Sequence, residues 1–68
     1  MALSARNRLP GVVEEVHTGS IMARIVVKVG DNLIESVITR TSVEEMQLKK
    51  GDHVLVVIKS TEVMVQKD

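Results

Sequence analysis

The 68-residue chain contains no cysteine and no phenylalanine, tyrosine or tryptophan. Without cysteine it can form neither a disulfide nor a Cys-based zinc site, which are common ways of stabilising so short a scaffold. A chain of this length also buries little apolar surface when it folds alone. We therefore expect oligomerisation to supply part of the stability.

The chain also has no net charge and no long apolar run. Nine basic residues balance nine acidic ones, so no overall field attracts polyanions or anionic membranes. The longest uninterrupted apolar run, residues 54–58, is too short to span a bilayer, and the N-terminus lacks the apolar core of a signal peptide. These absences predict a soluble, cytoplasmic protein without a membrane partner.

Valine and isoleucine dominate what is present, with 18 of the 68 positions. Their branched Cβ atoms suit a pleated sheet better than a helix. Gly30, Asp31 and Asn32 form a hairpin-type connector between two such apolar runs. Runs bounded by turn signals predict five strands in one all-β domain over residues 1–68, at positions 9–16, 21–29, 33–39, 53–59 and 62–66.

One segment, residues 41–51, departs from the strand pattern. Its apolar residues have helical spacing, Ser42 and Glu45 form a capping box, and Gly51 can end the helix. The chain is thus predicted to place one short helix between the third and fourth strands. Five strands with a helix at this position indicate a small Greek-key barrel of the OB type.

Neither catalysis nor nucleic-acid binding is favoured. His17 and His53 fall at strand ends without an acid–base set nearby, and the carboxylates are too dispersed for a metal-cation site. OB barrels hold single strands by stacking bases on aromatic rings, and this chain has none. We predict a protein that is not an enzyme and has no nucleic-acid partner.

Two polar clusters stand out from the aliphatic background, and each combines cations with small hydrogen-bonding groups. The first comprises Ser4, Ala5, Arg6 and Asn7, followed by Arg8, and the second comprises Lys59, Ser60 and Thr61. Cations with hydroxyl and amide donors are what a compact oxyanion requires. Ser42, at the predicted helix start, is a further candidate donor. Alternatively, the clusters are an ordinary polar arm and an ordinary hairpin turn, and Ser42 is a plain cap.

The whole chain resembles the molbindins, the Mop family of small molybdate-binding proteins. The resemblance rests on Ser-Ala-Arg-Asn at 4–7, Ile-Met-Ala-Arg-Ile at 21–25, Ile-Thr-Arg-Thr-Ser-Val at 38–43 and Lys-Ser-Thr-Glu-Val-Met at 59–64. It implies a single Mop domain that assembles as a hexamer, a trimer of dimers. Such an assembly would store molybdate or tungstate at its subunit interfaces, without an organic cofactor.

The resemblance also implies ligand residues. Ser4, Ala5, Arg6 and Asn7 would contact the oxyanion beside Lys59, Ser60 and Thr61, with Ser42 contributed by a neighbouring subunit or a facing edge. A second oxyanion site near a three-fold axis would use the turn His17, Thr18, Gly19 and Ser20. The alternative function is a structural or ligand-sensing interaction module of a molybdate-responsive system. That module would adjoin an effector domain, for which we expect no room in a chain of this length.

Overall fold

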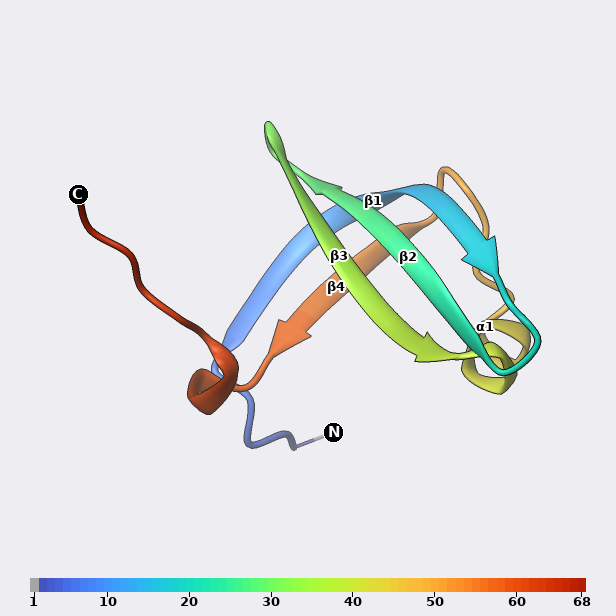
Figure 1. Cartoon of the computed structure of the whole chain (residues 1–68), viewed down its shortest axis with the longest axis horizontal. Helices are drawn as coiled ribbons and strands as arrows, with labels where there is room; N and C mark the ends of the chain where they lie inside the picture. Colours follow the sequence, from blue (N-terminus) through green and yellow to red (C-terminus); the bar gives the residue numbers. More distant parts are fainter. Residues whose placement is uncertain (1) are drawn as a thin grey trace.

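The computed structural model describes residues 2–68 and shows one antiparallel sheet with a short helix at one end (Figure 1). The spatial order of the strands is β3-β2-β1-β4. The strands are β1 (Asn7–Thr18), β2 (Met22–Val29), β3 (Asn32–Thr39) and β4 (His53–Ile58), with helix α1 (Arg40–Met46) between β3 and β4. The first four predicted strands and the position of the helix are thus confirmed, with small differences at their ends.

Strand β1 organises the sheet because it pairs with two different neighbours. Its first half pairs with β4, from Asn7 opposite Ile58 to Val12 opposite His53, and its second half pairs with β2. A bulge between Val13 and Glu15 bends the strand between the two partners. This bend curves the sheet, which stays open between β3 and β4.

The core lies on the concave side of the sheet and is entirely aliphatic. Val13, Ala23, Ile25, Val27 and Val43 form the buried cluster, so α1 contributes one side chain to it. Val26 is also only 3% exposed, although it alternates to the opposite face. Its register partners there are Glu15 on β1 and Glu35 on β3, and we infer that the stems of these side chains cover it.

The helix begins and ends earlier than the capping box predicted. Its N-cap is Thr39, whose hydroxyl accepts a hydrogen bond from the Ser42 backbone N–H at 3.1 Å. Ser42 therefore lies within the first turn, and its assignment as N-cap is wrong. The helix ends at Gln47, which adopts a left-handed conformation (φ 53°), while Gly51 belongs to the following turn. A threonine three residues earlier offers the same capping chemistry, and the pattern of apolar residues does not separate the two.

The predicted fifth strand is absent from the part of the chain that the structure describes. Residues Ser60–Glu62 form a single 3-10 turn, η1, and residues 63–68 have no regular secondary structure. The four strands therefore form an open sheet whose free edges are β3 and β4, and not the closed barrel that the sequence predicted. The physical reason is that no strand of the same chain lies beside residues 62–66 to pair with them. None of the helices within residues 2–68 is long and apolar enough to cross a membrane.

Candidate functional site

The fold brings the two predicted polar clusters to the same end of the molecule. Asn7 begins β1 opposite Ile58, the last residue of β4, and its side-chain amide donates to the Ile58 carbonyl at 3.1 Å. The residues before Asn7 and those after Ile58 consequently leave the sheet together, as the N-terminal segment and η1 in Figure 1. Two segments separated by about fifty residues in sequence become neighbours through one pair in the strand register.

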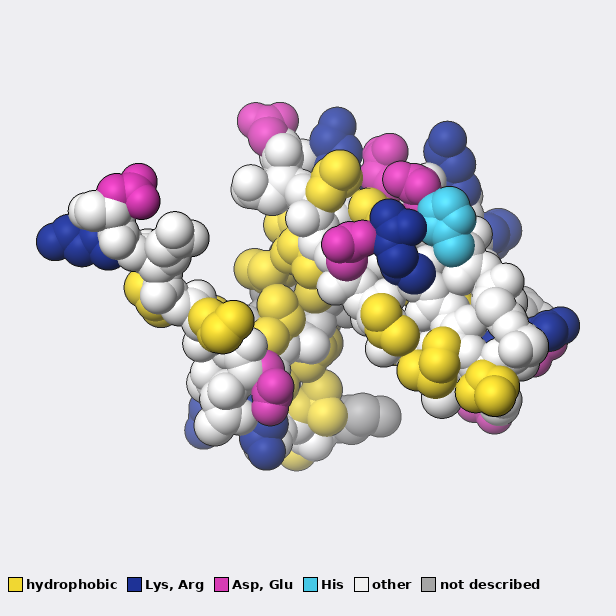
Figure 2. Space-filling view, viewed as in Figure 1, with side chains coloured by type: hydrophobic (Ala, Val, Ile, Leu, Met, Phe, Trp, Pro, Cys, Tyr) yellow, Lys and Arg dark blue, Asp and Glu magenta, His cyan; other side chains and the backbone are white. Residues whose placement is uncertain are grey.

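This end of the molecule carries cations that lack an intrachain partner. Arg6, Arg8 and Lys59 make no ion pair with any residue in the range 2–68. Arg24, Arg40 and Lys49 are paired, as the Lys49 ammonium is with Asp52 at 2.9 Å. Glu62 in η1 is the nearby acid, and Figure 2 shows basic side chains beside an acidic one at this end. The site has positive charge available for an anion.

Exposed hydroxyl groups lie in the same two segments as these cations. Ser4, Ser60 and Thr61 are exposed, and within residues 2–68 their side chains form no hydrogen bond. Ala5, which separates Ser4 from Arg6 in the sequence, is half-buried and carries no bulky group. Hydroxyl donors and cations around an uncrowded backbone can bind a small oxyanion without a metal or a covalent bond.

Ser42 lies at the opposite end of the sheet, in the first turn of α1 (Figure 1). Its hydroxyl oxygen accepts a hydrogen bond from the Thr39 hydroxyl at 2.9 Å, which leaves the Ser42 O–H free to donate. Within one chain the structure does not bring Ser42 to Arg6 or Lys59. Its predicted contribution therefore requires a second copy of the chain.

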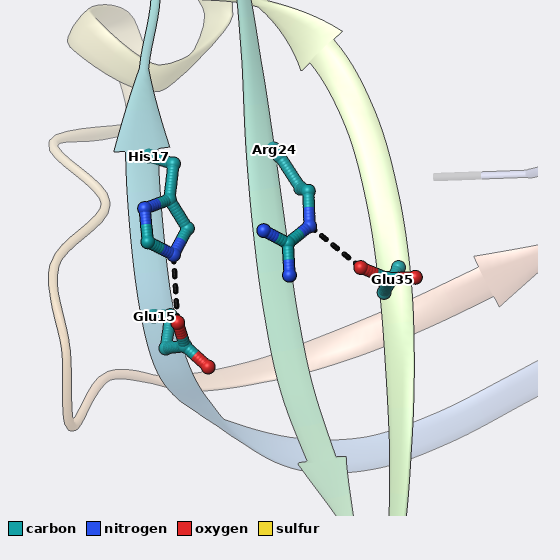
Figure 3. A network of polar contacts seen from close by, with 4 residues as sticks. All are labelled: Glu15, His17, Arg24 and Glu35. Carbon is teal, nitrogen blue, oxygen red and sulfur yellow. Dashed lines mark hydrogen bonds and ion pairs between the residues drawn. The ribbon is translucent and has the colours of Figure 1, made fainter.

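The turn predicted for a second oxyanion site also lies at the α1 end, but His17 points elsewhere. Its Nε2 lies 2.6 Å from a carboxylate oxygen of Glu15, on the outer face of β1 (Figure 3). The hydrogen bond to His17 lowers the pKa of Glu15 below its ordinary value of 4.5, and the charges of His17 and Arg24 act in the same direction. On β2, Arg24 bonds Glu35 at 2.6 Å. Because Glu15 already bonds His17 and Glu35 already bonds Arg24, this face has no unpaired cation from these two residues for an anion.

Sequence reasoning passed over three polar residues near that turn. Thr39, Arg40 and Thr41 line a shallow hollow together with Ser20, and the Arg40 backbone N–H donates to the Ile21 carbonyl at 2.8 Å. The Arg40 guanidinium lies 3.7 Å from the Glu44 carboxylate. All three residues lie in the Ile-Thr-Arg-Thr-Ser-Val run at 38–43. Their hydroxyl and guanidinium groups are anion-binding groups that the sequence already contained.

No group of three or more His, Asp or Glu side chains that could hold a metal ion occurs within residues 2–68. The chemistry available at the candidate site is therefore that of cations, hydroxyls and amides, all of which donate hydrogen bonds.

Comparisons with known proteins agree with this chemistry. The TOBE domain family matches residues 3–65 of the chain. A Clostridium pasteurianum protein named molybdenum-pterin-binding protein 1 is 46% identical over 66 residues, which cover 96% of this chain and 97% of that protein. The solved structure of a molybdate binding protein from Sporomusa ovata is similar, with a TM-score of 0.95, 37% identity and coverage of 98% of this chain and 100% of that one.

A third similar structure belongs to a longer chain. It is the cytoplasmic molybdate-binding protein ModG with molybdate bound, with a TM-score of 0.82 and 36% identity. The match covers 88% of this chain but 43% of that one. A unit of this kind thus occurs both as almost the whole of a protein and as one part of a larger protein.

Proposed function

The chain belongs to the TOBE domain family, and from this premise we propose that it binds molybdate reversibly and without catalysis. The similarity to the Mop proteins, which the sequence motifs indicated, is confirmed by these relatives. The observation that carries the proposal is the pairing of Asn7 with Ile58. It sets Ser4, Ala5, Arg6 and Asn7 beside Lys59, Ser60 and Thr61, with unpaired cations and free hydroxyls.

The charge and size of the ligand fit this arrangement. Molybdate is a tetrahedral dianion at neutral pH, so one Arg and one Lys neutralise it while hydroxyl and amide groups donate to its remaining oxygens. Each hydrogen bond to a charged group is worth about 1.5–3 kcal/mol. Several of them reach the roughly 8 kcal/mol of a micromolar Kd after the cost of binding is subtracted. Tungstate has the same charge and shape and is expected to bind as well.

A homo-oligomer completes the proposal. One chain supplies an open half-site at one end and Ser42 at the other, so a site that uses both lies between copies, as it would in a hexamer built as a trimer of dimers. Assembly would also provide the closed five-stranded barrel that the single chain lacks.

We propose that the protein stores or buffers the oxyanion in the cytoplasm. The second site at His17, Thr18, Gly19 and Ser20 stays a prediction.

The names of the curated relatives raise a pterin as a second possible ligand. A pterin is a bicyclic ring that proteins hold by stacking and by hydrogen bonds to its edge. The chain has no Phe, Tyr or Trp to stack on it, whereas the candidate site offers charge and hydroxyls. The inorganic oxyanion is therefore the better fit, and we propose no organic cofactor.

The alternative function is a ligand-sensing module whose contacts with other domains matter more than storage. The ModG match, which spans less than half of a longer chain, supports only the point that such a unit can be one part of a larger protein. The two roles share the ligand and differ in partner: a store binds only its own copies, whereas a sensing module also changes its affinity for a second domain when molybdate binds.

Isothermal titration calorimetry on protein freed of bound oxyanion tests the proposal, with molybdate, tungstate, sulfate and a free pterin as titrants. We expect saturable heats for molybdate and tungstate and weak or no binding of the pterin. Because sulfate has the same charge and shape but is smaller, selectivity against it would reflect the dimensions of the site. Absence of molybdate heat, or equal affinity for sulfate, would contradict the proposal.

A further inference from the structure

Asn7 is the polar member of an otherwise non-polar series on the concave side of β1. Positions 7, 9, 11 and 13 alternate to this side, where Leu9 is half-buried and Val13 is only 1% exposed. Ile58, the register partner of Asn7 on β4, is also half-buried. Asparagine is disfavoured within strands, and an aliphatic side chain would suit this position better. A residue that departs from a local rule in this way points to a role other than packing.

The Asn7 amide joins the start of β1 to the end of β4. Its Nδ2 donates to the Ile58 carbonyl oxygen at 3.1 Å, across 51 positions of sequence, and the bond is partly buried. Every other side-chain hydrogen bond within residues 2–68 is exposed and joins residues at most 11 positions apart. Hydrogen bonds shielded from water are stronger than exposed ones. The Asn7–Ile58 bond is therefore a specific long-range link between two strand ends.

This bond lies where the two cationic segments leave the sheet (Figure 1). The register of β1 with β4 ends at Asn7 and Ile58, so Arg6 and Lys59 are each the first residue beyond it. Both are exposed, and neither is held by an ion pair within residues 2–68. Strand ends open easily when their last pair is weak. The placement of both cations consequently depends on how firmly this last pair is held.

We propose that Asn7 is a positioning residue of the anion site and not one of its ligands. Its bond to the Ile58 carbonyl holds Arg6 and Lys59 in place before the anion arrives, so that binding does not have to order them. The inference rests on the proposed molybdate function and gives Asn7 a different role from the direct contact that the family resemblance implied. Direct contact through the second N–H of the amide is the alternative, and the binding test separates the two.

Asn7→Leu is the diagnostic variant, and Asn32→Leu is its matched control. Leucine suits an inward-facing position of this aliphatic sheet, so Asn7→Leu should fold, which urea denaturation verifies. Asn32 likewise begins a strand, β3, where it is paired with Val29. It is exposed, however, and its side chain makes no hydrogen bond within residues 2–68.

Calorimetric titration with molybdate of the wild type, Asn7→Leu, Lys59→Ala and the double variant tests the positioning role. We expect Asn7→Leu to raise the Kd about 10-fold in the wild-type background. In the Lys59→Ala background it should raise the Kd no more than about 3-fold, because a main group that the bond positions is then missing. Asn32→Leu should leave the Kd unchanged.

Two results of this titration would overturn the proposal. Equal losses in both backgrounds would identify Asn7 as an independent ligand or as a general contributor to stability, because independent effects add. No loss in the wild-type background would show that the bond to Ile58 is dispensable for binding.

A measurement without ligand separates failure of the Asn7–Ile58 bond from failure of molybdate binding. In oxyanion-free buffer, the backbone 15N order parameters of Arg6 and Lys59 should fall below about 0.6 in Asn7→Leu and stay at their wild-type values in Asn32→Leu. Unchanged order parameters in Asn7→Leu overturn the proposal, whatever the affinity. Lower order parameters, together with no molybdate heat in the wild type, would confirm that Asn7 orders the two segments and would contradict the proposed function alone.

Discussion

At the scale of single residues, the cations of this chain divide by whether a carboxylate already holds them. Arg24 and Lys49 bond Glu35 and Asp52 at 2.6 Å and 2.9 Å, and these exposed pairs order the surface while contributing little free energy of unfolding. Arg6 and Lys59 have no such partner within residues 2–68. Lys28, Lys50 and Lys67 also lack an ion pair within these residues, so what sets Arg6 and Lys59 apart is that each lies in a segment with exposed hydroxyl groups at the same end of the sheet.

The first prediction concerns these two cations. Arg6→Ala and Lys59→Ala each remove one charged donor to the oxyanion, so each should weaken molybdate binding about 10–100-fold. Calorimetric titration measures the loss, and urea unfolding shows that the fold persists. Lys50→Ala is the matched control, since Lys50 is exposed in the loop before β4 and distant from η1. Similar losses in all three variants would mean that binding follows general charge and not this site.

A second prediction concerns Asp52 and pH. Hydrogen bonds from the Lys49 ammonium, and then from its backbone N–H, hold the pKa of Asp52 below its ordinary value of 3.8. A carboxyl with a depressed pKa stabilises the fold above its unfolded pKa, and this stability is lost as pH falls through the folded pKa. Asp52→Asn should therefore lower the Tm at neutral pH, and the difference from wild type should shrink below pH 3.8.

Thermal unfolding monitored by circular dichroism between pH 7 and pH 2 measures this difference. Asp31→Asn serves as the control, because Asp31 is exposed in the β2–β3 turn and forms no ion pair within residues 2–68. A Tm difference for Asp52→Asn that stays constant across the whole range would contradict the linkage.

At the scale of elements, the third prediction concerns the start of α1. Thr39→Ala removes the hydroxyl that accepts from the Ser42 N–H and should lower the free energy of unfolding by about 1 kcal/mol, measured by urea denaturation. Thr39→Ser should restore most of it. Thr41→Ala is the control, because within residues 2–68 the Thr41 hydroxyl makes no hydrogen bond. A larger loss from Ser42→Ala than from Thr39→Ala would favour the cap inferred from the sequence.

The fourth prediction concerns the bend of β1 over β2. A Cβ at Gly11 would lie 2.6 Å from Val27 Cγ1 and 2.7 Å from the Lys28 carbonyl oxygen, and the backbone atom cannot move aside cheaply. Gly11→Ala should lower the free energy of unfolding by about 1–3 kcal/mol. Gly30→Ala, where a Cβ meets open space but φ is +60°, should cost about 1 kcal/mol from backbone strain alone. Equal stability of Gly11→Ala and wild type in urea denaturation would show that the strands can separate here.

The elements also show what the sequence could and could not predict. The first four strands were predictable because Val-rich runs end at turn residues such as Gly30 and Gly51. Only the motif resemblance suggested that the segments with Arg6 and Lys59 lie at one end of the sheet, because this placement follows from the Asn7–Ile58 register, a long-range pairing. The cap was missed because Thr39 and Ser42 are both good N-caps. The predicted fifth strand, residues 62–66, is not formed, because strand propensity alone does not provide a neighbouring strand for pairing.

At the scale of the whole molecule, missing aromatics and cysteines fit a chain whose fold is completed by copies of itself. Its described residues leave two strand edges, an apolar groove and an apolar segment unpaired. The proposed site lies next to η1, the turn that precedes this segment. Ligand binding and assembly are then expected to be thermodynamically linked, because an anion held between copies binds the assembled state more tightly than the separated chains.

The last prediction measures this linkage through thermal stability. Molybdate at 100 times its Kd should stabilise the assembled protein by about 2.7 kcal/mol, which corresponds to a Tm increase of roughly 10–20 °C for a domain of this size. Sulfate at the same concentration should raise the Tm far less, and Lys59→Ala should lose most of the molybdate effect. A full molybdate shift in Lys59→Ala, or an equal shift with sulfate, would contradict the proposed site.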